Sequence, residues 1–218
     1  MRPLLAVFAH PDDEAFGPAG TLALKSKKQD VYLICVTNGA AGKNSSRSKK
    51  NLSEIRKKEL RNSAKILGVK KVFFLNYEDG CLCNKFYHEI AEKIEAKIKK
   101  IKPATLMTFE LRGVSGHIDH IAVSLITTFV FNRSKFTNTL LYYCVDKREG
   151  DEFGNNYFIY FPPGYKKSEI DKIVDVSNVW DKKIETMMAH KSQRHDVEMI
   201  LKFRANLPKE EIFLVKKK

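Results

Sequence analysis

The segment Ala9-His10-Pro11-Asp12-Asp13-Glu14 stands directly at the end of an apolar run, Leu4 to Ala9. A run of this length predicts a buried β-strand, and the proline predicts a sharp turn where the strand ends. The turn places one imidazole and three carboxylates at the carboxyl end of that strand. Ligands of open parallel sheets bind beyond the carboxyl ends of the strands. This segment is therefore the first candidate for a functional site.

A second segment of the same kind, Gly116-His117-Ile118-Asp119-His120, follows the apolar run Thr105 to Phe109. Its two histidines are three residues apart at the expected start of a helix, so they can share one helix face. Three nitrogen or oxygen ligands with one open position are typical of catalytic zinc. The two segments together predict a mononuclear metal site, with one carboxylate and one histidine left over for proton transfer.

Each segment also has a simpler explanation. Asp12 or Asp13 could serve only as a helix N-cap, and Glu14 is expected only to begin the following helix. A histidine pair on a helix could be structural or exposed. The presence of both segments, each after a buried strand, favours the metal site.

Apolar strands and amphipathic helices alternate along the chain up to Cys144. The pattern predicts strands at 4–9, 31–37, 72–75, 105–109 and 140–145, helices at 14–27, 53–67, 85–101 and 117–131, and a polar loop at 40–50. Repeated β-α-β order predicts a Rossmann-like α/β fold, with a mostly parallel sheet covered by helices on both faces.

Beyond Cys144 the pattern is weaker. Residues 147–167 are expected to form an insertion or a lid, 179–194 a helix and 212–215 a last edge strand. Neither an internal repeat nor a linker is visible, so residues 1–218 are expected to form a single domain.

The composition is strongly basic, with a formal net charge of +13. The lysines are spread along several helices and do not alternate with aromatic residues, so no nucleic-acid partner is expected. A basic protein that binds nucleic acid or a membrane surface is the alternative class. The chain has no apolar run of about 18 residues and no signal-peptide pattern, so no transmembrane anchor is expected. With four scattered cysteines, these features predict a cytoplasmic protein.

The two segments resemble the signature motifs of the LmbE/PIG-L family. Its members are zinc-dependent N-acetylglucosaminyl deacetylases and relatives that act on other N-acyl sugars. The resemblance covers most of the chain through further matches: Thr37-Asn38-Gly39, Arg56 with Glu59 before Leu67-Gly68, Asp79-Gly80, and His190-Lys191-Ser192-Gln193. His190 and Gln193 could equally lie at the surface or cap a helix.

The resemblance implies that His10, Asp13 and His120 bind one Zn²⁺ ion. Fe²⁺ or another divalent ion remains an alternative, because sets of histidine and carboxylate accept both.

The resemblance also implies three catalytic roles. Asp12 is similar to the general base, and a protonated His117 to the group that stabilises the oxyanion. Asp119 is similar to the carboxylate that orients His117 and keeps it charged. Some members have a tyrosine two residues before the histidine of the second motif, where this chain has Ser115.

Arg56 and Asp79 match positions associated with recognition of sugar hydroxyl groups. An ion pair between Arg56 and Glu59, on one face of a helix, explains the arginine equally well.

The expected reaction is removal of the acetyl group from an N-acetylglucosamine-type sugar or its conjugate, by metal-assisted attack of water on the amide. The alternative is the same chemistry on another N-acyl glycoside: a thiol precursor, an antibiotic intermediate or a lipid-linked sugar. The aromatic segment 157–165 is expected to decide between them.

Overall fold

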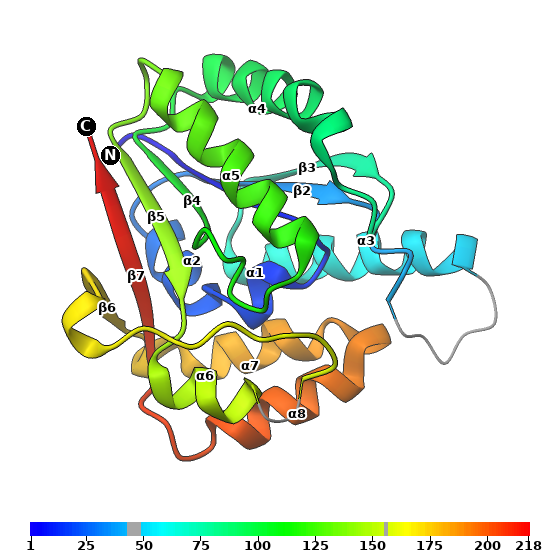
Figure 1. The fold of residues 1–218 in the computed structure, drawn as a ribbon, viewed down its shortest axis with the longest axis vertical. Coiled ribbons are helices and arrows are strands. Elements are labelled where there is room, and N and C mark those ends of the chain that lie inside the picture. Colours follow the sequence, from blue (N-terminus) through cyan, green and yellow to red (C-terminus); the bar gives the residue numbers. More distant parts are fainter. Residues whose placement is uncertain (43–48, 155–156) are drawn as a thin grey trace.

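The six predicted strands and one further strand form one seven-stranded sheet, with the order β3-β2-β1-β4-β5-β7-β6 (Figure 1). We analysed a computed structural model that describes residues 1–42, 49–154 and 157–218. The five neighbouring strands β3, β2, β1, β4 and β5 run parallel to one another, whereas β7 is antiparallel to β5 and β6. The expectation of a mostly parallel sheet is therefore confirmed. The strands are β1 (Leu4–Phe8), β2 (Val31–Thr37), β3 (Lys71–Tyr77), β4 (Thr105–Phe109), β5 (Thr139–Cys144), β6 (Lys172–Asp175) and β7 (Glu210–Lys217).

Helices cover both faces of the sheet, as expected. The eight α-helices of the described ranges are α1 (Asp13–Phe16), α2 (Ala19–Ser26), α3 (Lys49–Leu67), α4 (Tyr87–Ile101), α5 (Ile118–Arg133), α6 (Lys147–Gly154), α7 (Trp180–Met188) and α8 (Arg194–Arg204). Side chains of β1 alternate between the faces: Leu4 packs in the core formed with α2, α3 and α7, and Leu5 in the core formed with α4 and α5. Within the described residues, no helix has the length and apolarity needed to cross a bilayer.

The prediction of a single helix at 14–27 is wrong in one respect, because two helices, α1 and α2, occupy this segment. Pro18 has no backbone N–H to continue the first helix, and it restricts the conformation of Gly17. A Cβ on Gly17 would lie 2.8 Å from the carbonyl oxygen of Asp13. The chain therefore turns after α1, and this short helix holds Asp13 at the carboxyl edge of the sheet.

The region after Cys144 departs most from expectation. The predicted helix 179–194 ends at Met188, and a further helix, α8, follows. The predicted edge strand is β7, which lies between β5 and β6, and the edge strand β6 was missed. The expected loop 40–50 lies partly outside the described residues, and α3 begins at Lys49 rather than Ser53.

A buried ion pair joins this region to the turn between α1 and α2. The Lys183 ammonium on α7 donates to Glu211 on β7 at 2.7 Å and to the carbonyl oxygen of Gly17 at 2.6 Å. Glu211 also accepts from the backbone N–H groups of Gly20 and Thr21. The carboxylate thus satisfies the N-terminus of α2.

We predict that Lys183→Met lowers the free energy of unfolding by about 3–5 kcal/mol, because it leaves the Glu211 carboxylate buried without its cation. Lys70→Met is the matched control, since Lys70 pairs with Asp30 at an exposed position. It should cost less than about 1 kcal/mol. Chemical denaturation measures both free energies of unfolding. Equal losses in the two variants would show that the buried pair stabilises the fold no more than the exposed pair does.

Candidate active site

The two sequence segments meet because β1 and β4 are neighbours in the sheet. The turn after β1 carries His10, Asp12 and Asp13, and the loop after β4 leads to His117 and His120 at the start of α5. These residues line a pocket of about 460 Å³. The backbone of Asp12 has φ 148°, a conformation that costs about 1–3 kcal/mol for a residue with a side chain and is concentrated at functional sites.

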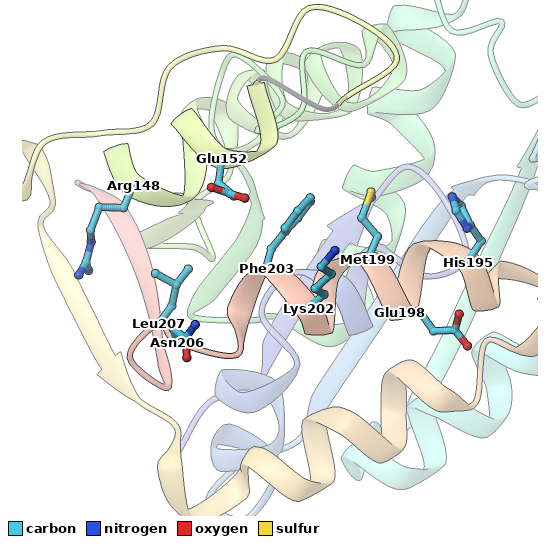
Figure 2. Close-up of a pocket in the computed structure, with 9 residues that line it drawn as sticks. All are labelled: Arg148, Glu152, His195, Glu198, Met199, Lys202, Phe203, Asn206 and Leu207. Atoms are coloured by element: carbon cyan, nitrogen blue, oxygen red, sulfur yellow. The ribbon is translucent and has the colours of Figure 1, made fainter.

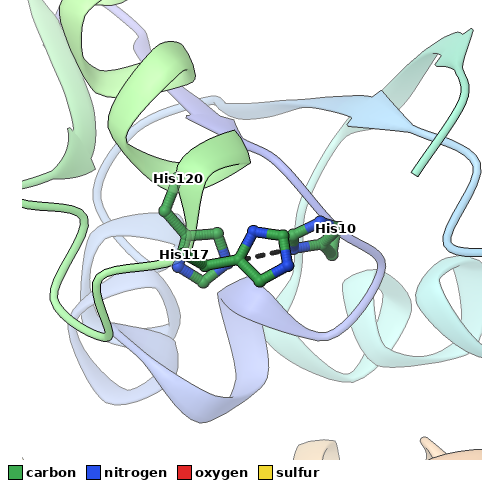
Figure 3. A group of neighbouring side chains, drawn as sticks. All are labelled: His10, His117 and His120. Atoms are coloured by element: carbon green, nitrogen blue, oxygen red, sulfur yellow. Dashed lines mark hydrogen bonds between the residues drawn. The ribbon is translucent and has the colours of Figure 1, made fainter. Parts of the chain in front are cut away.

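The three residues expected to bind a metal face one another. His10 Nδ1 lies 2.9 Å from His120 Nε2, a contact drawn as a dashed line in Figure 3. Asp13 Oδ1 lies 3.2 Å from His120 Nε2, and Asp13 Oδ2 lies 3.9 Å from His10 Nδ1. Tetrahedral ligands of Zn²⁺ are about 3.3 Å apart when their bonds to the metal are about 2.0–2.1 Å. The spacing of these atoms therefore suits one such ion.

The outer nitrogen of each imidazole is already engaged. His120 Nδ1 lies 3.0 Å from the carbonyl oxygen of Gly113, so it is the nitrogen that carries the proton. His10 Nε2 lies 2.9 Å from Asp79 and 3.2 Å from Asp119, and it donates to these carboxylates. In the neutral rings, the two inner nitrogens then present lone pairs to each other. A proton on His10 or a cation held by both nitrogens resolves this arrangement. Hydrogen bonds at the outer nitrogens are the usual support of metal-binding histidines.

The electrostatic surroundings of His10 also favour positive charge. Burial alone would lower the pKa of His10, but its hydrogen bonds with Asp119 and Asp79 and the charge of Asp13 raise it to about 10. The pKa of Asp13 is well below its usual range: burial would raise it, but the charge and hydrogen bond of His120 outweigh that effect. The carboxylates around His10 and His120 therefore favour positive charge in this part of the pocket.

Asp79 and Asp119 support His10 from outside this set. They form a cluster with His10 in which the ligand atoms all lie within 4.8 Å of one another. Their oxygens are already used: Asp119 accepts from the N–H groups of Gly80 and Leu82, and Asp79 from that of Ala41. Each of these carboxylates thus already has hydrogen-bond partners, which favours a role in supporting His10 over a role as a second metal site.

The expected pairing of Asp119 with His117 takes a different form. The Asp119 carboxylate contacts His10, while its backbone N–H donates to His117 Nδ1 at 3.2 Å. A neutral His117 then carries its proton on Nε2. Burial, together with the charges of His10 and His120, lowers the pKa of His117. The direction of this pKa shift opposes the expected protonation of His117, and the contact with the Asp119 backbone favours a neutral ring with its proton on Nε2.

Arg56 is buried against Asp12. Its guanidinium donates to Asp12 Oδ2 at 2.8 Å and to the carbonyl oxygen of Gly39 at 2.8 Å. Burial raises the pKa of Asp12 to about 6, although the charge of Arg56 opposes the shift. Gly39 has φ 66°, and a Cβ there would lie 3.0 Å from the guanidinium carbon, so only glycine fits this turn. The alternative ion-pair partner, Glu59, instead accepts two hydrogen bonds from Ser192.

Sequence reasoning missed a buried network behind the pocket. His190 Nε2 lies 2.8 Å from Glu14, which also accepts from Ser63. Both Glu14 and His190 are almost completely buried, so the surface position considered for His190 is wrong, and Glu14 does more than begin a helix. These two residues are 176 positions apart, and no local pattern relates them.

Tyr157, the first residue of the aromatic segment 157–165, contacts the site in a way that the sequence did not predict. Its hydroxyl hydrogen-bonds with Ser115, and burial raises its pKa to about 12. Ser115 in turn lies 3.1 Å from His120 Nδ1. A tyrosine therefore borders the site, but it comes from the segment after α6 rather than from position 115.

Comparison with known proteins shows similarities along most of the chain. A family model described as PIG-L, GlcNAc-PI de-N-acetylase, matches residues 5–131. The chain is 29% identical over 198 residues to the probable N-acetyl-alpha-D-glucosaminyl L-malate deacetylase 2 of Bacillus cereus, covering 88% of this chain and 84% of the relative.

Two solved structures share the fold. N,N'-diacetylchitobiose deacetylase from Pyrococcus horikoshii has a TM-score of 0.75 at 22% identity, over 99% of this chain and 84% of that one. GalB, the 4-carboxy-2-hydroxymuconate hydratase from Pseudomonas putida, also has a TM-score of 0.75 at 16% identity, over 100% of this chain and 97% of that one. Because these two proteins differ in activity, the fold alone does not establish the reaction.

We predict that the purified protein binds one divalent ion per chain and that His120→Ala weakens this binding at least about tenfold, since even outer-shell substitutions cost 10–100-fold. The control is His88→Ala, because His88 is exposed on α4, outside the site residues. Elemental analysis and competition with a chelator measure the binding. Unchanged metal content in His120→Ala would rule out this ligand assignment.

Proposed function

Because the chain belongs to the PIG-L family, we propose that it is a metal-dependent hydrolase that removes the acetyl group from an N-acetylglucosamine-type sugar or its conjugate. The observation that carries the proposal is the convergence of His10, Asp13 and His120, with the Asp12 carboxylate in the same pocket. The same chemistry on another N-acyl glycoside is the alternative. We treat residues 1–218 as one catalytic domain.

We assign Zn²⁺ as the ion held by His10, Asp13 and His120, while Fe²⁺ suits the same donors. When bound, such an ion polarises an amide carbonyl and lowers the pKa of a water molecule from 15.7 toward about 7.

Asp12 is the proposed general base. It lines the pocket, and its raised pKa, about 6, lets it both take and return a proton near neutral pH. It accepts a proton from the attacking water as the oxygen bonds to the amide carbon, and it delivers that proton to the nitrogen as the C–N bond breaks. The products are acetate and a free amine. Arg56 holds the carboxylate in place through this cycle.

His117 is the proposed oxyanion donor. Its Nδ1 accepts from the Asp119 backbone, which leaves Nε2–H free to point toward the reacting carbonyl oxygen. A neutral donor suffices for this role, and one well-placed donor contributes about 3 kcal/mol to stabilisation of the transition state. Its position at the N-terminus of α5 adds the favourable end of the helix dipole.

Arg56 and Asp79 line the pocket and remain the proposed contacts for sugar hydroxyl groups, which would share these side chains with their present partners Asp12, Gly39, His10 and Ala41. The four free cysteines are in keeping with a cytoplasmic location. Only the net charge of +13 supports the alternative that the protein binds nucleic acid. That alternative does not explain why the expected metal-binding residues lie together.

We predict that Asp12→Asn retains its metal but loses at least about 100-fold in kcat, because the amide cannot accept the proton of water. Asp30→Asn, at the surface beside Lys70, is the control and should turn over normally. The assay measures equimolar acetate and free amine from a panel of N-acetylated amino sugars and their conjugates. Full turnover by a metal-loaded Asp12→Asn enzyme would exclude Asp12 as the base, and no release from any substrate by the metal-loaded wild type would refute the proposed function.

A further inference from the structure

The loop between β4 and α5 leads to His117 and His120, and its backbone is strained. Val114 has φ 61°, a left-handed conformation that a β-branched residue adopts only at a cost in free energy. The Val114 side chain lines the catalytic pocket. Such strain is retained only where neighbouring groups enforce it. The groups that hold Val114 in this conformation therefore also shape the site.

One buried carboxylate, Glu110, holds this loop. Its Oε1 accepts a hydrogen bond from the Val114 N–H at 3.0 Å, and its Oε2 accepts from the Arg112 N–H at 2.8 Å. The Tyr165 hydroxyl donates to the same Oε2 at 2.8 Å, and Arg112 Nε lies 3.3 Å from it. Glu110 is only 1% exposed, so water cannot easily replace these donors. The carboxylate therefore fixes the loop backbone on both sides of Gly113.

The Gly113 carbonyl is the outer partner of a proposed metal ligand. His120 Nδ1 lies 3.0 Å from this carbonyl oxygen, and the Ser115 hydroxyl lies 3.1 Å from the same nitrogen. The Gly113 carbonyl and the Val114 N–H belong to one planar peptide unit and point in opposite directions. A single rigid unit therefore connects the Glu110 carboxylate to the His120 imidazole. Hydrogen bonds at the outer nitrogen of a ligand orient its ring and affect metal affinity.

We propose that Glu110 is a positioning residue of the metal centre. Through the peptide unit between Gly113 and Val114, its carboxylate fixes the acceptor of His120 Nδ1 and thereby directs His120 Nε2 toward the ion. Glu110 is not among the residues that line the pocket, so it acts through the loop rather than on the substrate. This inference rests on the proposed function, because it takes His120 to be a metal ligand.

The first test measures the metal affinity of Glu110→Gln. Glutamine keeps the size of the side chain, but its amide nitrogen cannot accept a hydrogen bond, so one of the loop N–H groups loses its partner. We expect the affinity for zinc, measured by competition with a chelator, to fall by about 10–100-fold. Wild-type affinity in a folded Glu110→Gln protein would overturn the proposal.

Glu198→Gln is the matched control for this change from carboxylate to amide. Glu198 lies on α8, in the groove between α6 and α8, and does not line the catalytic pocket (Figure 2). It pairs with Arg194 at an exposed position. The Glu198→Gln protein should therefore keep the wild-type affinity for zinc, and an equal loss in both variants would overturn the assignment to Glu110.

Val114→Gly tests the proposed route, because glycine adopts a φ near 61° without strain. A loop without this strain needs less support from the carboxylate. The double variant Glu110→Gln, Val114→Gly should therefore recover at least about threefold of the lost zinc affinity, as expected for two coupled neighbours. A role of Glu110 in fold stability alone would give no such recovery. The absence of recovery would show that the carboxylate does not act through this turn.

A measurement without metal separates this proposal from the proposed function. NMR of the ring nitrogens reports how fast the His120 Nδ1–H proton, held by Gly113, exchanges with water. In Glu110→Gln this exchange should be at least about tenfold faster, whereas the His190 Nε2–H, bound to Glu14, should keep its rate. This result would support the positioning role even if no sugar were deacetylated. An unchanged rate at His120 would overturn that role, whatever the enzyme does with sugars.

Tyr165→Phe provides a second variant if Glu110→Gln does not fold. It removes the hydroxyl that donates to Glu110 but keeps the aromatic ring, whose centroid lies 4.2 Å from the Arg112 guanidinium carbon. We expect lower zinc affinity and faster exchange at His120, each by at least about twofold. Tyr160→Phe, at an exposed position of the same segment, should change neither value. Wild-type values in Tyr165→Phe would overturn the proposal.

Discussion

The arrangement of the site depends on how His10 is held. Two carboxylates, Asp79 and Asp119, engage one nitrogen of its ring and thereby direct the other nitrogen at His120. Burying carboxylates costs several kcal/mol each unless hydrogen bonds and opposite charge compensate them. Backbone N–H groups of the Gly80 loop supply part of that compensation, and positive charge at His10 supplies the rest. A divalent ion between the imidazoles is therefore consistent with the carboxylates and backbone groups that support His10, as well as with the ligands themselves.

The remainder of the fold supports this arrangement at a distance. The pair of Lys183 and Glu211 fixes the turn between α1 and α2, and that turn positions Asp13. Arg56 bridges the Asp12 carboxylate and the Gly39 turn, although the Asp12 backbone is strained. Strain of this kind persists only where surrounding contacts enforce it, and it is concentrated at sites of function. The same contacts that stabilise the buried charges thus keep the reactive groups in place.

Much of this could be predicted from the sequence, because local patterns carry the information. The apolar run Leu4 to Ala9 and the turn at Pro11 placed His10 at the edge of the sheet, and the parallel order of strands predicted that the His117 segment would lie at the same edge. The failures have physical causes. The partner of the Asp119 carboxylate depends on how the Gly80 loop closes over α5, and the pair of Glu14 and His190 joins distant segments. The position of β6 depends on its pairing with β7, which no periodicity encodes.

A solved hydratase shares this fold, so the architecture by itself does not select the reaction. The most direct test is a crystal structure of the zinc-loaded protein with anomalous diffraction recorded at the zinc edge. We expect one anomalous peak, with His10 Nδ1, His120 Nε2 and an Asp13 oxygen at bonding distance from it, and with Asp79 and Asp119 still in contact with His10 Nε2. A peak among His10, Asp79 and Asp119, or no peak in the pocket, would contradict it.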